Sequence, residues 1–128
     1  MRRTTGALLA GAMTLGLAQA ANAKTYFWIS HGSPADPVWT YFLQGAEQWG
    51  TDTGNTVNTS FHNGDVASHQ EAVRSAIAAG ADGIATTSPD PGSLVEVAGE
   101  ANEAGIAIIN FNTPDPSAGF DVITGAPL

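Results

Sequence analysis

Short polar side chains gather in four segments that are rich in glycine, proline and aspartate: residues 31–36, 62–65, 88–90 and 112–115. Hydroxyl and amide groups donate and accept hydrogen bonds, whereas carboxylates only accept them. One large aromatic residue, Trp39, follows the first segment closely. An Asp or Asn side chain can bridge neighbouring hydroxyl groups, and an indole can cover the C–H face of a sugar ring. This combination indicates binding of a neutral, polyhydroxylated molecule.

Other chemistry has less support in these segments. His31, Ser33 and Asp36 are the residue types of a nucleophilic triad, but a triad needs side chains from separate elements and these share one short loop. His62 and His69 could suggest a zinc site, yet the sequence has no cysteine and no His-x-x-x-His motif. A phosphate-binding loop that ends in Gly-Lys-Ser/Thr is also absent. We therefore expect no metal, no other cofactor and no catalytic residue.

Four strand-like runs come just before the polar segments, at residues 25–30, 56–61, 83–87 and 106–111. Their starts lie 31, 27 and 23 residues apart, which is the rhythm of successive right-handed βαβ units. The sequence thus predicts an α/β fold, a doubly wound parallel sheet in three αβα layers. In such a sheet the ligand crevice lies outside the carboxyl ends of the strands, where the polar segments fall.

The first helix is expected to begin with Asp36 as its N-cap and Pro37 as its first residue. Apolar residues at helical spacing predict a buried stripe, formed by Val38, Phe42, Ala46 and Trp49. With Val38 directed into the core, Trp39 is expected to face the crevice.

The second helix is expected over Val66–Ala79, and the third is expected to start at Ser93 as N-cap. Gly80 and Gly105 follow them as the C-terminal glycines that helices favour. Residues 120–125 are expected to form a fifth strand or a crossover. The residues expected to face inward are Val73, Ala76 and Ile77 in the second helix and Leu94, Val97, Ala98 and Ala101 in the third.

Residues 1–23 have the pattern of a cleaved secretory signal. Two arginines give a positive start, residues 6–17 are apolar and uncharged, and Ala21-Asn22-Ala23 supplies the small-x-small cleavage site. The apolar run is shorter than the about 20 residues of a membrane-spanning helix. Without a cysteine, the chain cannot carry a lipid-modified cysteine. We expect export by the general secretory route, cleavage before Lys24, a periplasmic location and no membrane insertion after cleavage.

Residues 24–128 are strongly acidic, since only Lys24 and Arg74 oppose twelve carboxylates, a net charge of −10. Such a surface repels phosphate backbones and anionic lipids, so we expect no nucleic-acid partner. The hydrophobic fraction of 43% is ordinary for a globular domain. Because no disulfide can form, packing of the core must hold the domain together.

Three segments together resemble the periplasmic solute-binding proteins of sugar ABC transporters, of the ribose/galactose-binding type. They are ISHGSPADPVW at 29–39, SFHNGDVASHQEAVRSAIAAGADGIATTSPDPGSL at 60–94 and AGIAIINFNTPDP at 104–116. The resemblance extends over residues 24–120. It implies the first lobe of a type I periplasmic binding protein, a sugar as ligand, an ABC transporter permease as partner, and no enzymatic activity.

The resemblance also implies that the loops after the strands contact the sugar. The corresponding positions in this sequence are Asp36, Trp39, Asn63, Thr87, Ser88, Asn112 and Thr113. Some of these residues have an alternative, structural role: Asp36 can cap a helix, and the pair before Pro114 can be ordinary turn residues.

Proteins of this type have two lobes joined by three crossovers and are much longer than this sequence. We therefore expect residues 24–128 to be an incomplete amino-terminal lobe, in which hinge closure around a ligand cannot operate alone. The expected function is the solute-binding component of a sugar importer. Two alternatives stay open: a small exported hydrolase on a flavodoxin-like sheet that uses Asp36 or Asp90, and a one-lobe protein that dimerises to form its cleft.

Overall fold

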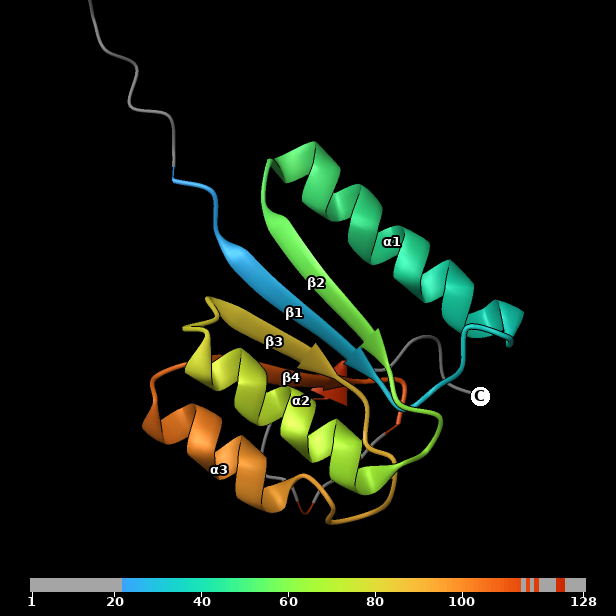
Figure 1. Ribbon diagram of the computed structural model, residues 1–128, viewed down its shortest axis with the longest axis vertical. Coiled ribbons are helices and arrows are strands. Elements are labelled where there is room, and N and C mark those ends of the chain that lie inside the picture. The colour runs from blue at the N-terminus through green and yellow to red at the C-terminus, as the bar shows by residue number, and fades with distance from the viewer. Residues whose placement is uncertain (1–21, 114, 116, 118–121, 124–128) are drawn as a thin grey trace, which may run out of the picture.

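A parallel sheet forms the centre of the computed structural model, which describes residues 22–113, 115, 117 and 122–123 (Figure 1). The strands are β1 (Thr25–Ser30), β2 (Thr56–Phe61), β3 (Gly83–Thr86), β4 (Ala107–Phe111) and β5 (Val122–Ile123). Their order across the sheet is β2-β1-β3-β4-β5, and every neighbouring pair is parallel. The predicted fold class is confirmed.

The register aligns the carboxyl ends of the strands along one edge. Ser30 at the end of β1 pairs with Phe61 at the end of β2, and Ile29 pairs with Thr86 at the end of β3. Thr86 in turn pairs with Asn110 of β4. We call this side of the sheet, with the loops that follow the strands, the carboxyl edge.

Helix α1 lies alongside β2, and the helices α2 and α3 cover one face of the sheet (Figure 1). Their bounds are Pro37–Thr53, Val66–Ala78 and Val95–Glu103. Asp36 is the N-cap of α1, where its Oδ1 accepts a hydrogen bond from the backbone N–H of Val38 at 3.0 Å. The predicted start of the first helix is therefore confirmed.

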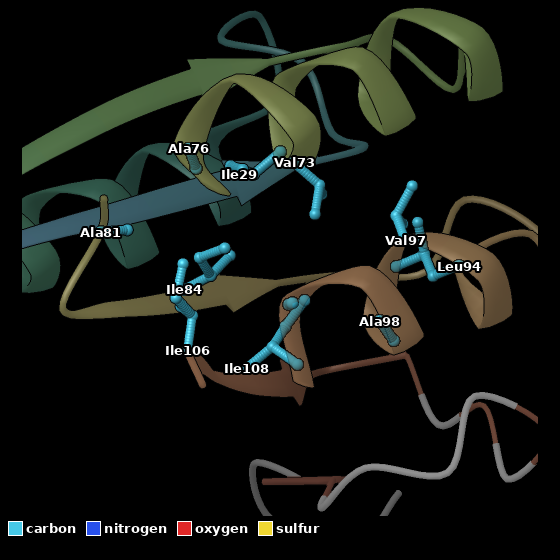
Figure 2. Packing of buried hydrophobic residues seen from close by; sticks show 11 residues of the cluster. Ile29, Val73, Ala76, Ala81, Ile84, Leu94, Val97, Ala98, Ile106 and Ile108 are labelled. Carbon is cyan, nitrogen blue, oxygen red and sulfur yellow. The ribbon is translucent and has the colours of Figure 1, made fainter. Parts of the chain in front are cut away.

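The hydrophobic core lies between the sheet and the helix pair α2–α3 (Figure 2). Ile29, Ile84 and Ile108 come from three neighbouring strands and meet side chains of both helices. The predicted inward residues of α2 and α3 are confirmed: Val73, Ala76, Leu94, Val97, Ala98 and Ala101 are all fully buried, and Ile77 packs against them in part.

The start of α3 differs from the expectation. Leu94 occupies the N-cap position, and no side chain there bonds the helix end. The hydroxyl of Ser93 instead donates to the backbone carbonyl of Asp90 at 2.6 Å, which closes the turn before the helix. Serine side chains bond nearby backbone groups in turns as readily as in caps, so its presence alone does not choose between the two.

The predicted buried stripe of α1 is wrong. Val38, Phe42 and Trp49 are 53%, 38% and 44% exposed, and the buried residue of this helix is Gly50. The helix lies against β2 at the side of the sheet and leaves the sheet face beside it open. A groove of about 480 Å³ remains there, and we call it the apolar groove. Its lining includes Tyr26, Trp28, Ala46, Trp49, Gly83, Ala85, Ala107 and Ile109.

The ends of the chain bear on two further predictions. Residues 120–125 were expected to form a strand or a crossover, and Val122–Ile123 forms a strand that pairs with β4. The predicted signal segment lies outside the described residues, apart from Asn22 and Ala23. Within the described part of the chain, no helix combines the length and apolar character that crossing a membrane requires.

Candidate functional site

Hydrogen bonds join the loops of the carboxyl edge to one another. The first loop is tied to the second, since Asn63 N–H donates to the Gly32 carbonyl at 3.0 Å and Gly64 N–H to the His31 carbonyl at 2.7 Å. It is tied to the third by the backbone N–H of His31, which donates to the Thr87 hydroxyl at 2.8 Å. Hydrogen bonds of Ser88 join the third loop to the fourth, as described below. The four loops of the carboxyl edge are therefore connected to one another, and we call them the rim.

Trp39 packs over the first loop. A Cβ atom at Gly32 would lie 2.4 Å from the indole, so only glycine fits beneath the ring. The indole stands edge-on to the His31 ring at 5.0 Å and is tilted against Phe42 at 5.7 Å. We expected Trp39 to face the crevice because Val38 would be directed into the core. Val38 is exposed, so that reasoning was wrong. Trp39 is nevertheless half-buried at the carboxyl edge, and its contact with a ligand stays a prediction.

Three of the predicted ligand-binding residues are exposed polar residues at the rim: Asp36, Asn63 and Asn112. The two asparagines have positive φ angles, 49° and 66°, in the left-handed region that Asn tolerates better than most residues. Asp36 uses one carboxylate oxygen for the cap of α1. A carboxylate has enough lone pairs to accept a ligand hydroxyl at the same time.

Two other predicted residues, Thr87 and Ser88, are buried. The Thr87 hydroxyl contacts both the backbone N–H of His31 and its Nδ1 atom, the latter at 2.7 Å. Ser88 donates its backbone N–H to the Thr113 hydroxyl at 2.8 Å, and its own hydroxyl accepts from the Asn110 amide at 3.1 Å. These hydroxyls hold the rim together, and their contact with a ligand stays a prediction.

Asp115 is a residue of the rim that sequence reasoning did not select. It is only 1% exposed, and its carboxylate accepts from the backbone N–H of Gly92 at 2.9 Å, from the Ser88 hydroxyl at 3.3 Å and from Ser117. Burial would raise the pKa of Asp115, but the hydrogen bonds from Ser117, Gly92 and Ser88 outweigh burial and lower it. Asp115 therefore pins the fourth loop to the third. The neighbouring sequence, with a proline on each side of Asp115, does not indicate which groups donate hydrogen bonds to its carboxylate.

The second residue that sequence reasoning missed is His69. Its side chain is fully buried in the first turn of α2, and its Nε2 lies 2.8 Å from the Thr86 hydroxyl. Its Nδ1 has no partner among the described residues, and its ring centroid lies 5.2 Å from that of His62. Burial, with smaller contributions from the charges of His62 and His31, lowers the pKa of His69 to about 4. A neutral histidine beneath the rim is the result.

The rim offers hydrogen-bond donors and acceptors that are held in fixed directions. Among the described residues, no three histidine, aspartate or glutamate side chains are grouped so that they could hold a metal ion. Asp36 and Asp90, the residues of the hydrolase alternative, lie in different loops, and each takes part in a turn or cap. The arrangement suits reversible binding of a hydroxylated molecule at the carboxyl ends of the strands.

Comparison with protein families identifies one match. A sequence model described as a periplasmic binding protein domain matches residues 27–126. No curated protein matches the chain.

Solved structures similar to this chain include several sugar-transporter proteins. A periplasmic sugar-binding protein from Legionella pneumophila is 31% identical with a TM-score of 0.67, over 72% of this chain and 34% of that one. A carbohydrate transporter from Acidothermus cellulolyticus, solved in complex with myo-inositol, is 29% identical with a TM-score of 0.70, over 77% and 35%. A sugar-binding protein from Bacillus halodurans is 28% identical with a TM-score of 0.67, over 74% and 33%. The chain spans about a third of the length of these structures.

Proposed function

This chain belongs to the periplasmic binding protein family, and we propose that its carboxyl edge is one wall of a binding site for a neutral sugar or cyclic polyol. The wall carries exposed carboxylate and amide groups, Asp36, Asn63 and Asn112, around the half-buried indole of Trp39. Hydroxyl groups of a sugar can donate to these oxygens and accept from these amides, while the indole covers the apolar C–H face of the sugar. The single observation that carries the proposal is the hydrogen-bonded rim that holds these residues at one edge.

The ligand class follows from charge as well as shape. With a net charge of −10 over residues 24–128, the protein disfavours anionic ligands such as sugar phosphates. The structure from Acidothermus cellulolyticus, 29% identical to this chain, is in complex with the uncharged polyol myo-inositol. A ligand of this kind agrees with the polar groups of the rim.

In the proposed role, the protein serves a sugar ABC importer, exported to the periplasm and working with a transporter permease. The signal pattern of residues 1–23 supports the location. We expect cleavage between Ala23 and Lys24 when the protein is produced in a bacterium with an outer membrane. Mass spectrometry of periplasmic material would check this prediction, and retention of Met1 or Arg2 on that material would contradict it.

The affinity of this chain should be low. The wall encloses a ligand from one side, and the groups that would enclose it from the other side do not belong to the described residues. Because binding must first offset the lost freedom of the ligand, half an enclosure leaves little net affinity. We expect a dissociation constant of about a millimolar, against about a micromolar for a fully enclosed sugar.

Nuclear magnetic resonance tests the proposal. In ¹⁵N-labelled protein, myo-inositol should shift amide signals of the four loops at the carboxyl edge and leave those at the opposite edge unchanged. Trp39→Ala and Asn112→Ala should each weaken binding by about 1–3 kcal/mol, because they remove a stacking face and a hydrogen-bond partner.

Trp49→Ala is the matched control. It removes the same side chain from the same helix, but from the apolar groove, where the indole packs edge-on against Tyr26 at 5.0 Å. An equal loss of binding in Trp39→Ala and Trp49→Ala would contradict the proposed site. Amide shifts confined to residues of the apolar groove would show that the ligand binds there instead.

A further inference from the structure

We propose that His31 is a further ligand-binding residue, which donates a hydrogen bond from its Nε2–H to an oxygen of the bound polyol. The proposal rests on the function proposed above and adds to it the donor that directs the ligand. None of the residues that sequence reasoning assigned to the ligand is a histidine.

The position of His31 is set by the neighbours of β1. It is the first residue after the strand, and β1 lies between β2 and β3 in the sheet. Its carbonyl accepts from Gly64 N–H on the β2 side at 2.7 Å, and its N–H donates to the Thr87 hydroxyl on the β3 side at 2.8 Å. The backbone is therefore held from both sides before any ligand arrives.

The Thr87 hydroxyl determines which ring nitrogen of His31 carries the proton. This hydroxyl is fully buried, and among the described residues its two partners are the N–H of His31 and the Nδ1 of His31, at 2.8 and 2.7 Å. A backbone N–H can only donate, so the proton of the hydroxyl has Nδ1 as its acceptor. The opposite tautomer would leave a buried hydroxyl proton without an acceptor, which is costly. Nδ1 therefore accepts, and Nε2 carries the proton.

The ring itself is held in a fixed direction. The indole of Trp39 stands edge-on to it at 5.0 Å, and that indole is seated closely over Gly32. Burial lowers the pKa of His31, so the ring is neutral at neutral pH. The His31 side chain is itself only half-buried at the carboxyl edge, and among the described residues its ring bonds through Nδ1 and not through Nε2.

The chemistry of this donor complements the carboxylate of the rim. Asp36 can only accept, so it orients a ligand hydroxyl by accepting a hydrogen bond from it. The same or a neighbouring hydroxyl then presents lone pairs, which an N–H of fixed direction can bind. Because the tautomer and the ring are set in advance, little conformational freedom is lost on binding.

The first test measures the tautomer in the protein without ligand. A two-bond ¹⁵N–¹H correlation spectrum of ¹⁵N-histidine-labelled protein at pH 7.5 should show His31 protonated at Nε2. In Thr87→Val this preference should weaken, and in Thr87→Ser it should return. Protonation at Nδ1 in the unaltered protein would overturn the proposal.

The second test adds myo-inositol as the probe. The Nε2 signal of His31 should shift together with the amides of the carboxyl edge. His31→Leu should weaken binding about tenfold, whereas His31→Gln, whose side-chain N–H₂ can occupy the place of Nε2, should restore most of it. The amide spectrum of each variant shows whether it folds, and if His31→Leu does not fold, the ligand-dependent shift of Nε2 decides.

The two proposals fail in different ways. If the amides around Trp39 and Asn112 respond to myo-inositol while the His31 ring does not, the inference about His31 is wrong and the proposed function stands. If neither myo-inositol nor a neutral monosaccharide, D-allose, shifts any signal at the carboxyl edge at tens of millimolar, the proposed function and the inference about His31 are both overturned.

Discussion

At the scale of single residues, the polar side chains of the carboxyl edge divide into two kinds. Thr87, Ser88 and Asp115 are buried and each bonds to a neighbouring loop, whereas Asp36 and Asn112 are exposed. The buried residues hold the rim in place, and the exposed ones are available to a ligand. Preorganisation of this sort limits the freedom that is lost on binding.

The buried His69 should make the stability of the protein depend on pH. Its folded pKa is about 4 against an ordinary value of 6.5, so between these values the unfolded chain binds a proton that the folded protein does not. The free energy of unfolding is therefore undiminished above pH 6.5 and falls as the pH is lowered toward 4. The total decrease from His69 is about 3 kcal/mol. The lowered pKa values of His31 and His62 act in the same direction.

Urea unfolding at a series of pH values would measure this effect. His69→Gln should flatten the dependence between pH 6.5 and 4, because glutamine does not titrate. His62→Gln is the control, since His62 is only partly buried, and it should change the slope less. An unchanged slope in His69→Gln would show that another group is responsible.

At the scale of elements, the ends of helices are fixed by local bonds. Asp65 is the N-cap of α2, and its Oδ1 accepts from the backbone N–H of Ser68 at 2.7 Å. This bond, with that of the Ser68 hydroxyl, lowers the pKa of Asp65. The same helix delivers His69 beneath the rim, so the cap sets both the start of α2 and the place of that histidine.

Asp65→Ala should lower the free energy of unfolding by about 1 kcal/mol, because the N–H of Ser68 loses its partner. Asp65→Ser should lose less, since serine also caps helices. Glu71→Ala, at an exposed position of the same helix, should have little effect. Thermal unfolding of the three variants compares them, and an Asp65→Ala variant as stable as the unaltered protein would contradict the capping role.

At the scale of the whole molecule, the two faces of the sheet differ. The pair α2–α3 closes one face over the hydrophobic core, while among the described residues the apolar groove beside α1 stays open on the other. Tyr41 on α1 is 73% exposed as well. Exposed apolar surface favours association between copies of the protein, and the high negative charge of the protein opposes that association.

The protein should therefore bind an apolar fluorescent dye and associate more at high salt, which screens its charge. Ala107→Glu places a charge at an exposed position of the apolar groove and should reduce both effects. Val95→Glu, on a helix of the other face where Val95 is 46% exposed, should leave them unchanged. Dye fluorescence and sedimentation measure the two effects, and an equal reduction by both variants would rule out the groove as their cause.

The sequence by itself determined the parallel α/β fold, the cap at Asp36, the inward residues of α2 and α3, and the edge at which the polar loops meet. Each of these follows from a local pattern: β-prone runs at βαβ spacing, capping residues and helical periodicity. The tertiary structure alone decided that Val38 and Trp49 stay exposed, because periodicity identifies the apolar side of a helix but not whether anything packs against it. It alone decided that Thr87 and Asp115 are buried, that His31 contacts Thr87 and that His69 contacts Thr86. Short polar side chains bond equally well to a ligand, to water or to another loop, and which partner they find depends on segments far away in the chain.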